Sequence, residues 1–116
     1  MPELLSTIDS DPARYPGLLS EFDAVMLKHG LQRFAATPGL QELQGRKVLY
    51  FEYRRDADEK WAFITGTDIV RAGSLEIRVY SSALPMSQRE PALADLRHIV
   101  SKHGAELRIN PDYTGR

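Results

Sequence analysis

The alternation of apolar and charged positions is the most regular pattern in this chain. Three segments place one apolar residue between a glutamate and an arginine: Glu52-Tyr53-Arg54, Glu76-Ile77-Arg78 and Glu106-Leu107-Arg108. Residues two apart in a β-strand share a face, so each segment would present both charges on one side and its apolar residue on the other. The pattern predicts an antiparallel sheet with an apolar inner face and a charged outer face.

Segments rich in aromatic and β-branched residues predict the strands of this sheet. They cover residues 46–54, 60–66 and 74–81, and the polar run 55–59 is typical of a hairpin loop between the first two. A short fourth strand is predicted over residues 105–109, where charged and apolar positions alternate again.

Helical spacing of apolar residues predicts two helices, over residues 18–29 and 88–103. Gly30 and Gly104 follow them directly, at the position where a helix commonly ends in a left-handed conformation.

The second helix also carries a start signal. Ser87 and Glu90 have the spacing of a capping box, in which the two side chains bond the exposed amides of the first turn. Pro91 fits this first turn, where its missing N–H costs little.

Together these elements predict a single α+β domain over residues 1–116 with the order α-β-β-β-α-β. We expect a mostly antiparallel four-stranded sheet with both helices packed on one face. Residues 1–17, with closely spaced prolines and glycine, are expected to form an irregular arm, and residues 111–116 a polar tail. The expected core is Leu18, Phe22, Val25, Met26, Leu49, Phe51, Phe63, Leu75, Ile77, Val79, Leu93, Leu96, Val100, Leu107 and Ile109, and Trp61 is expected to join it.

Composition limits the possible functions. The 116 residues suit one domain, and the absence of cysteine excludes disulfides, thiolate metal sites and cysteine nucleophiles. No apolar run reaches the ~20 residues of a membrane span, and the N-terminus lacks signal-peptide features, so we expect a cytoplasmic protein without a membrane partner. The net charge of -1 gives no general attraction to nucleic acid.

Residues with catalytic or ligand-binding chemistry are scattered. His98 and His103 are five apart, whereas a metal-binding pair on a helix needs three or four, so no metal site is predicted. The chain has no phosphate-loop or dinucleotide motif, so no cofactor is expected. A small carboxylate enzyme using Glu52, Glu76 or Glu106 with a nearby histidine stays a possible alternative. Each glutamate has an arginine two residues away, which favours cross-strand ion pairs over a catalytic carboxylate, and no catalytic residue is assigned.

Nucleic-acid binding is another alternative, through the sheet or the helix faces. The order of helix, three-stranded meander and helix resembles that of double-stranded-RNA-binding domains, which grip phosphates at the start of the second helix. Here residues 86–91 contain a single arginine and a glutamate, which departs from that pattern.

The outer face of the sheet is the candidate binding surface. Tyrosine and arginine are favoured at protein interfaces, and mixed charges confer specificity. We therefore expect a small protein-binding module without catalysis of its own: an adaptor, chaperone, inhibitor or immunity-type protein. Its partner would be another protein, and homodimerisation through an unprotected edge strand is possible. The candidate partner-binding residues are Tyr50, Glu52, Arg54, Glu76, Arg78, Tyr80, Glu106 and Arg108.

Overall fold

The computed structural model describes residues 1–34, 41–43 and 46–113. In chain order the elements are β1 (Leu4–Asp9), the 3-10 turn η1 (Pro12–Arg14), α1 (Tyr15–Leu27), β2 (Gln32–Phe34), β3 (Gln41–Leu43), β4 (Arg46–Val48), β5 (Tyr50–Arg54), β6 (Ile64–Thr67), β7 (Ser74–Val79), the 3-10 turn η2 (Ser81–Ala83), α2 (Met86–Lys102) and β8 (Arg108–Ile109).

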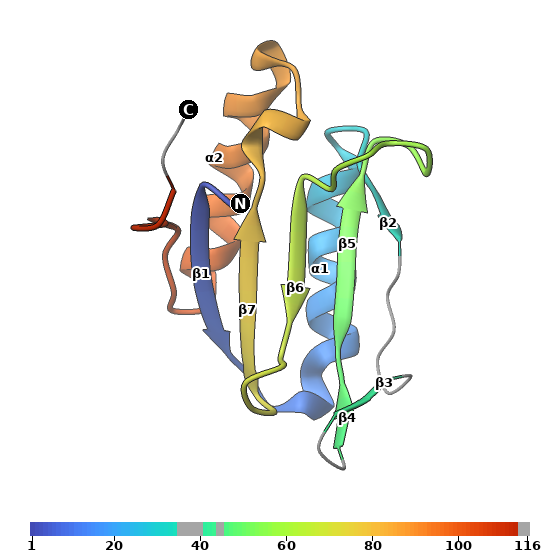
Figure 1. Ribbon diagram of the computed structural model, residues 1–116, viewed down its shortest axis with the longest axis vertical. Coiled ribbons are helices and arrows are strands. Elements are labelled where there is room, and N and C mark those ends of the chain that lie inside the picture. Colours follow the sequence, from blue (N-terminus) through green and yellow to red (C-terminus); the bar gives the residue numbers. More distant parts are fainter. Residues whose placement is uncertain (35–40, 44–45, 114–116) are drawn as a thin grey trace.

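The described residues form one six-stranded antiparallel sheet in the order β2-β5-β6-β7-β1-β8, beside a separate two-stranded ribbon, β3-β4. Both helices lie behind the same face of the sheet, α1 behind β5 and β6 and α2 behind β1 and β7 (Figure 1). The α+β class is confirmed. The prediction of four strands was wrong, because β1 and β2 were not predicted.

The largest correction concerns the N-terminal segment, which is not an irregular arm. Leu4–Asp9 forms β1 and pairs with β7 along its whole length, from Leu4 opposite Val79 to Asp9 opposite Ser74. The polar Ser6 stands on the inner face between Leu4 and Ile8 and is buried, which interrupts the apolar alternation that identifies strands. Residues about 70 positions away therefore determine this strand.

The predicted strand 46–54 is interrupted at Leu49, between β4 and β5. The Leu49 amide donates to Oδ1 of the buried Asp68 at 2.7 Å, and not to a backbone carbonyl of a neighbouring strand. Asp68 Oδ2 also accepts from the Tyr15 hydroxyl at 3.2 Å, and that hydroxyl accepts from the Gly73 amide at 3.0 Å. One buried carboxylate thus joins the beginnings of α1 and β5 to the β6–β7 connection.

Both helices are confirmed, with shifted ends. α1 begins at Tyr15, three residues before the predicted start, and Gly30 and Gly104 have the positive φ expected after a helix, 74° and 76°. The prediction of a capping box at Ser87 and Glu90 was wrong. α2 begins at Met86 with Pro85 as its N-cap and has no side-chain cap, so Ser87 lies inside the first turn.

The core lies between the inner face of the sheet and the helices. Phe22 of α1 packs on Phe51 and Tyr53 of β5, with ring centroids 5.8 and 6.4 Å away. Two residues that were predicted to be in the core are exposed: Ile109, 79% exposed at the end of the edge strand, and Trp61, 61% exposed in the β5–β6 loop. The remaining expected members are buried, apart from Val25, which is partly buried against the core.

Candidate functional site

The outer face of the sheet, opposite the helices, carries most of the predicted binding residues. The register places Glu52 opposite Thr65, and Thr65 opposite Arg78 on the next strand. Tyr50 and Glu76 both lie opposite Thr67. The two Glu-x-Arg segments of β5 and β7 therefore flank β6 on one surface, and their central residues Tyr53 and Ile77 are buried, as predicted.

The ion pairs on this face differ from the predicted cross-strand arrangement. Arg54 pairs with Glu52 at 3.0 Å, and Arg78 pairs with Glu76 at 2.5 Å, each within its own strand. The threonines of β6 separate the two strands, so the opposite charges cannot meet across the sheet. Each arginine instead folds back on the glutamate two residues earlier.

The electrostatics of the face favour fixed charges. The hydrogen bond to Glu76 raises the pKa of the Arg78 guanidinium despite its partial burial. Burial, followed by the negative charge of Glu52, raises the pKa of the Tyr50 hydroxyl, which lies 3.4 Å from the Glu52 carboxylate. Both shifts hold these groups in their ordinary protonation state at neutral pH.

The third Glu-x-Arg segment is organised differently. Leu107 is buried as predicted, but Glu106 precedes β8 and only Arg108 belongs to a strand, opposite Leu5 of β1. In the described part of the chain Glu106 and Arg108 form no ion pair with each other. Tyr80 directly follows β7 and is half-buried, and its amide donates to the Phe63 carbonyl at 2.7 Å.

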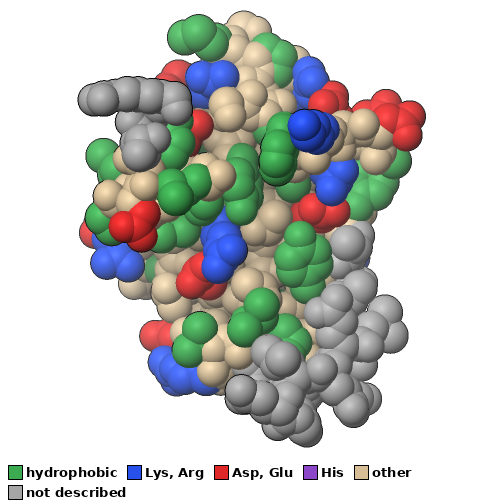
Figure 2. Space-filling view, viewed as in Figure 1, with side chains coloured by type: hydrophobic (Ala, Val, Ile, Leu, Met, Phe, Trp, Pro, Cys, Tyr) green, Lys and Arg blue, Asp and Glu red, His purple; other side chains and the backbone are tan. Residues whose placement is uncertain are grey.

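A hollow of about 280 Å³ opens on the outer face beside the Glu76–Arg78 pair. Ile69 and Val70 border it with 52% and 84% of their surfaces exposed. The Thr67 hydroxyl also lines it, is buried, and has no hydrogen-bond partner within the described residues. Figure 2 looks onto this face and shows hydrophobic side chains gathered around a central pair of opposite charges.

Sequence reasoning missed Thr67, Ile69 and Val70. Residues 67–73 lie between the predicted strands 60–66 and 74–81, and no functional residue was expected among them. Two adjacent β-branched apolar residues in a loop were the available signal, since loop residues are usually polar when they contact only solvent.

Two of the three histidines connect the two helices. His29, just after α1, lies 2.7 Å from Asp95 of α2, and His103, just after α2, lies 3.0 Å from Glu21 of α1. This reciprocal arrangement requires the helices to run antiparallel, as Figure 1 shows. The described residues contain no group of three or more histidine and acidic side chains suited to a metal ion.

A lysine completes each of these contacts. Lys28 lies 3.2 Å from Asp95, and Lys102 lies 3.1 Å from Glu21. Hydrogen bonds from His29 and Lys28 lower the pKa of Asp95. Burial alone would raise the pKa of Glu21. The hydrogen bonds from Lys102 and His103 outweigh this effect, so the pKa of Glu21 lies below its usual value. These clusters fit a structural role between helices.

Among the described residues, no helix is both long enough and apolar enough to cross a membrane. Compared with models of protein families, with curated proteins and with solved structures, the chain shows no match.

Proposed function

We propose that this chain is a small protein-binding module, and that it docks a partner protein through the outer face of its sheet. An adaptor, chaperone, inhibitor or immunity-type protein would act in this way. The observation that carries the proposal is the hollow beside Glu76 and Arg78. There Ile69 and Val70 are exposed next to the Thr67 hydroxyl, which has no hydrogen-bond partner among the described residues.

The composition of this surface suits a protein partner. Interfaces place apolar contacts at the centre and polar groups around them. Here Ile69 and Val70 offer apolar area, Thr67 offers a buried acceptor and donor, and the Glu76–Arg78 pair offers one charge of each sign. The hollow has room for one partner side chain, and Tyr50 and Glu52 extend the polar part of the surface along β5.

The sign of the charges argues for protein over nucleic acid as the partner. Phosphate binding needs an excess of positive charge, because the affinity comes from neutralising phosphates. On β5 and β7 each arginine is already paired with a glutamate. A protein can instead supply complementary charges of both signs.

The test is affinity purification from the native host with three forms of the full chain: wild type, Val70→Glu and Met86→Glu. Both substituted residues are exposed, 84% and 78%, so both variants should fold, but Met86 belongs to α2 on the other side of the molecule. We expect a partner that wild type and Met86→Glu retain and Val70→Glu loses. Titration of that partner with each purified form measures the loss directly, and equal binding by Val70→Glu would refute the proposal.

A further inference from the structure

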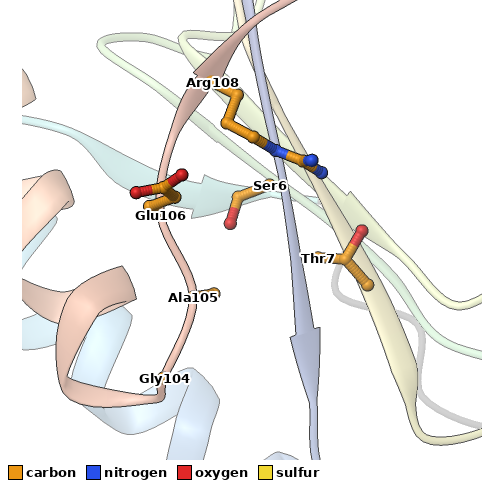
Figure 3. Close-up of a pocket in the computed structure, with 6 residues that line it drawn as sticks. All are labelled: Ser6, Thr7, Gly104, Ala105, Glu106 and Arg108. Atoms are coloured by element: carbon orange, nitrogen blue, oxygen red, sulfur yellow. The ribbon is translucent and has the colours of Figure 1, made fainter.

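A second groove follows the other side of strand β1. β1 pairs with β7 from Leu4 to Asp9, but in the described part of the chain it pairs with β8 only at Leu4 and Leu5. Beyond Leu5 the two segments separate. Figure 3 shows residues 104–106 running apart from β1, with a gap between them.

One hollow lies along this unpaired edge, and a second adjoins the end of β1. The first, about 370 Å³, has Ser6 and Thr7 on one wall and residues 104–106 and Arg108 on the other. The second, about 650 Å³, is lined by Asp9, Ser10 and His103, and for its larger part by the segment that leads into α1: Asp11, Ala13, Arg14, Gly17 and Leu18. Only the first hollow therefore lies between β1 and residues 104–106, and the second lies at the Asp9 end of β1, where the chain enters α1.

The side chain of Ser6 points into the first hollow (Figure 3). Ser6 is only 1% exposed, and its hydroxyl has no hydrogen-bond partner among the residues that the structure describes. A buried hydroxyl without a partner is rare in folded proteins, because it has lost its water and gained nothing. A ligand that enters the gap would supply the missing partner.

We propose that this groove binds an extended peptide segment of a partner protein, which adds to the sheet as a strand beside Ser6–Asp9. Strand addition suits an unpaired edge because the main chain of the peptide bonds the free amides and carbonyls of the strand. The four residues provide an edge of about 13 Å, enough for a short extended segment. This contact is separate from the outer-face surface and does not depend on it.

The walls of the groove favour a polar peptide. Glu106 and Arg108 stand on the wall opposite β1 and form no ion pair within the described residues, so one charge of each sign is available to the ligand. The described residues that follow Arg108 lead away from the groove. The Asn110 amide donates to the Glu3 carbonyl at 2.8 Å, and its side chain donates to the Pro2 carbonyl at 2.9 Å, which carries the chain toward the N-terminal end of β1.

The test begins with a phage-displayed library of random 12-residue peptides selected on the immobilised full chain. Enriched peptides are synthesised, and their affinities are measured by fluorescence polarisation for wild type, Ser6→Ala and Ser82→Ala. Ser82 is an exposed serine of η2 and serves as the matched control. We expect Ser6→Ala to bind about three- to tenfold more weakly, the effect of one lost hydrogen bond, and Ser82→Ala to bind like wild type.

Amide hydrogen exchange on the wild-type protein supplies a measurement that does not depend on any variant folding. Amides of Ser6–Asp9 that face the groove should exchange rapidly in the free protein and become protected when the peptide is bound. The proposal is wrong if no peptide is enriched, or if these amides are already protected in the free protein. It is also wrong if the peptides protect Ile69 and Val70 instead, an outcome that would favour the outer-face proposal.

Discussion

Replacing Gly66 by alanine should destabilise the protein sharply, although alanine is usually preferred to glycine in a strand. Gly66 of β6 lies opposite Phe51 of β5, and the Phe51 ring covers the space where a Cβ would stand. A Cβ built there meets the Cζ, Cε1 and Cε2 atoms of the ring at 2.2, 2.5 and 2.9 Å. Carbon atoms in contact prefer about 3.5–4.0 Å, so the ring would have to retreat by about 1 Å or more.

The ring has little room to retreat. Phe51 is 0% exposed, and its centroid lies 5.8 Å from both the Phe22 and Tyr53 rings. Overfilling a packed core costs about 1–3 kcal/mol, and we expect the upper end because the obstacle is a packed ring. Loss of the glycine's backbone freedom offsets about 0.5–1 kcal/mol. The expected net loss is about 2 kcal/mol, or about 5–10 °C in the melting temperature.

Urea denaturation followed by far-UV circular dichroism measures this loss. The lone Trp61 is already 61% exposed, so its fluorescence would report unfolding poorly. Gly17→Ala is the control: its Cβ meets no described atom within 4 Å and it lies in α1, so it should stabilise by about 0.5–1 kcal/mol. In a Phe51→Leu background, which lacks the clashing atoms, Gly66→Ala should cost less than about 0.5 kcal/mol. A Gly66→Ala protein as stable as wild type would refute the packing argument.

Three further predictions concern buried or paired polar groups. Tyr53→Phe removes the hydroxyl that lies 2.7 Å from the Asp23 carboxylate, and should lower the unfolding free energy by about 1–2 kcal/mol in the same assay, with an unchanged value contradicting it. Asp68→Ala leaves the Leu49 amide without its side-chain acceptor and should cost about 2 kcal/mol or more; hydrogen exchange should then be faster at Leu49, and unchanged exchange there would count against this role. In the folded protein the pKa of Glu21 lies below its usual range, so the ionised carboxylate adds to the free energy of unfolding near neutrality. That contribution is lost as the pH falls through about 5 to 3. Wild type should therefore lose more stability than Glu21→Gln over that interval, and parallel pH curves would show that these contacts add nothing.

The sequence was informative wherever a local pattern agreed with the tertiary structure. The apolar stripes predicted both helices, and Gly30 and Gly104 marked their ends because a positive φ is a local requirement. The alternation around Tyr53 and Ile77 predicted the two faces of β5 and β7 correctly. The candidate surface on these strands could be predicted for the same reason, because alternation assigns charges to a face without knowledge of the neighbouring strand.

The failures share a physical cause. β1 was missed because its inner face includes the polar Ser6, and only pairing with β7 makes this segment a strand. The cross-strand ion pairs were wrong because strand order places the threonines of β6 between β5 and β7. Trp61 was expected in the core from its residue type, but the loop that carries it leaves it exposed with Lys60 5.3 Å from its ring centroid.

By itself, then, the sequence determined the α+β class, the helices and the two-sided character of the central strands, because these follow from the spacing of side chains along one segment. The tertiary structure alone decided the six-stranded order, the hollow beside Thr67 and the unpaired edge at Ser6. These features depend on which distant segments meet. Pairing between residues some 70 positions apart leaves no periodic signal in either segment, and a hydroxyl without a partner can be recognised only when its neighbours are in place.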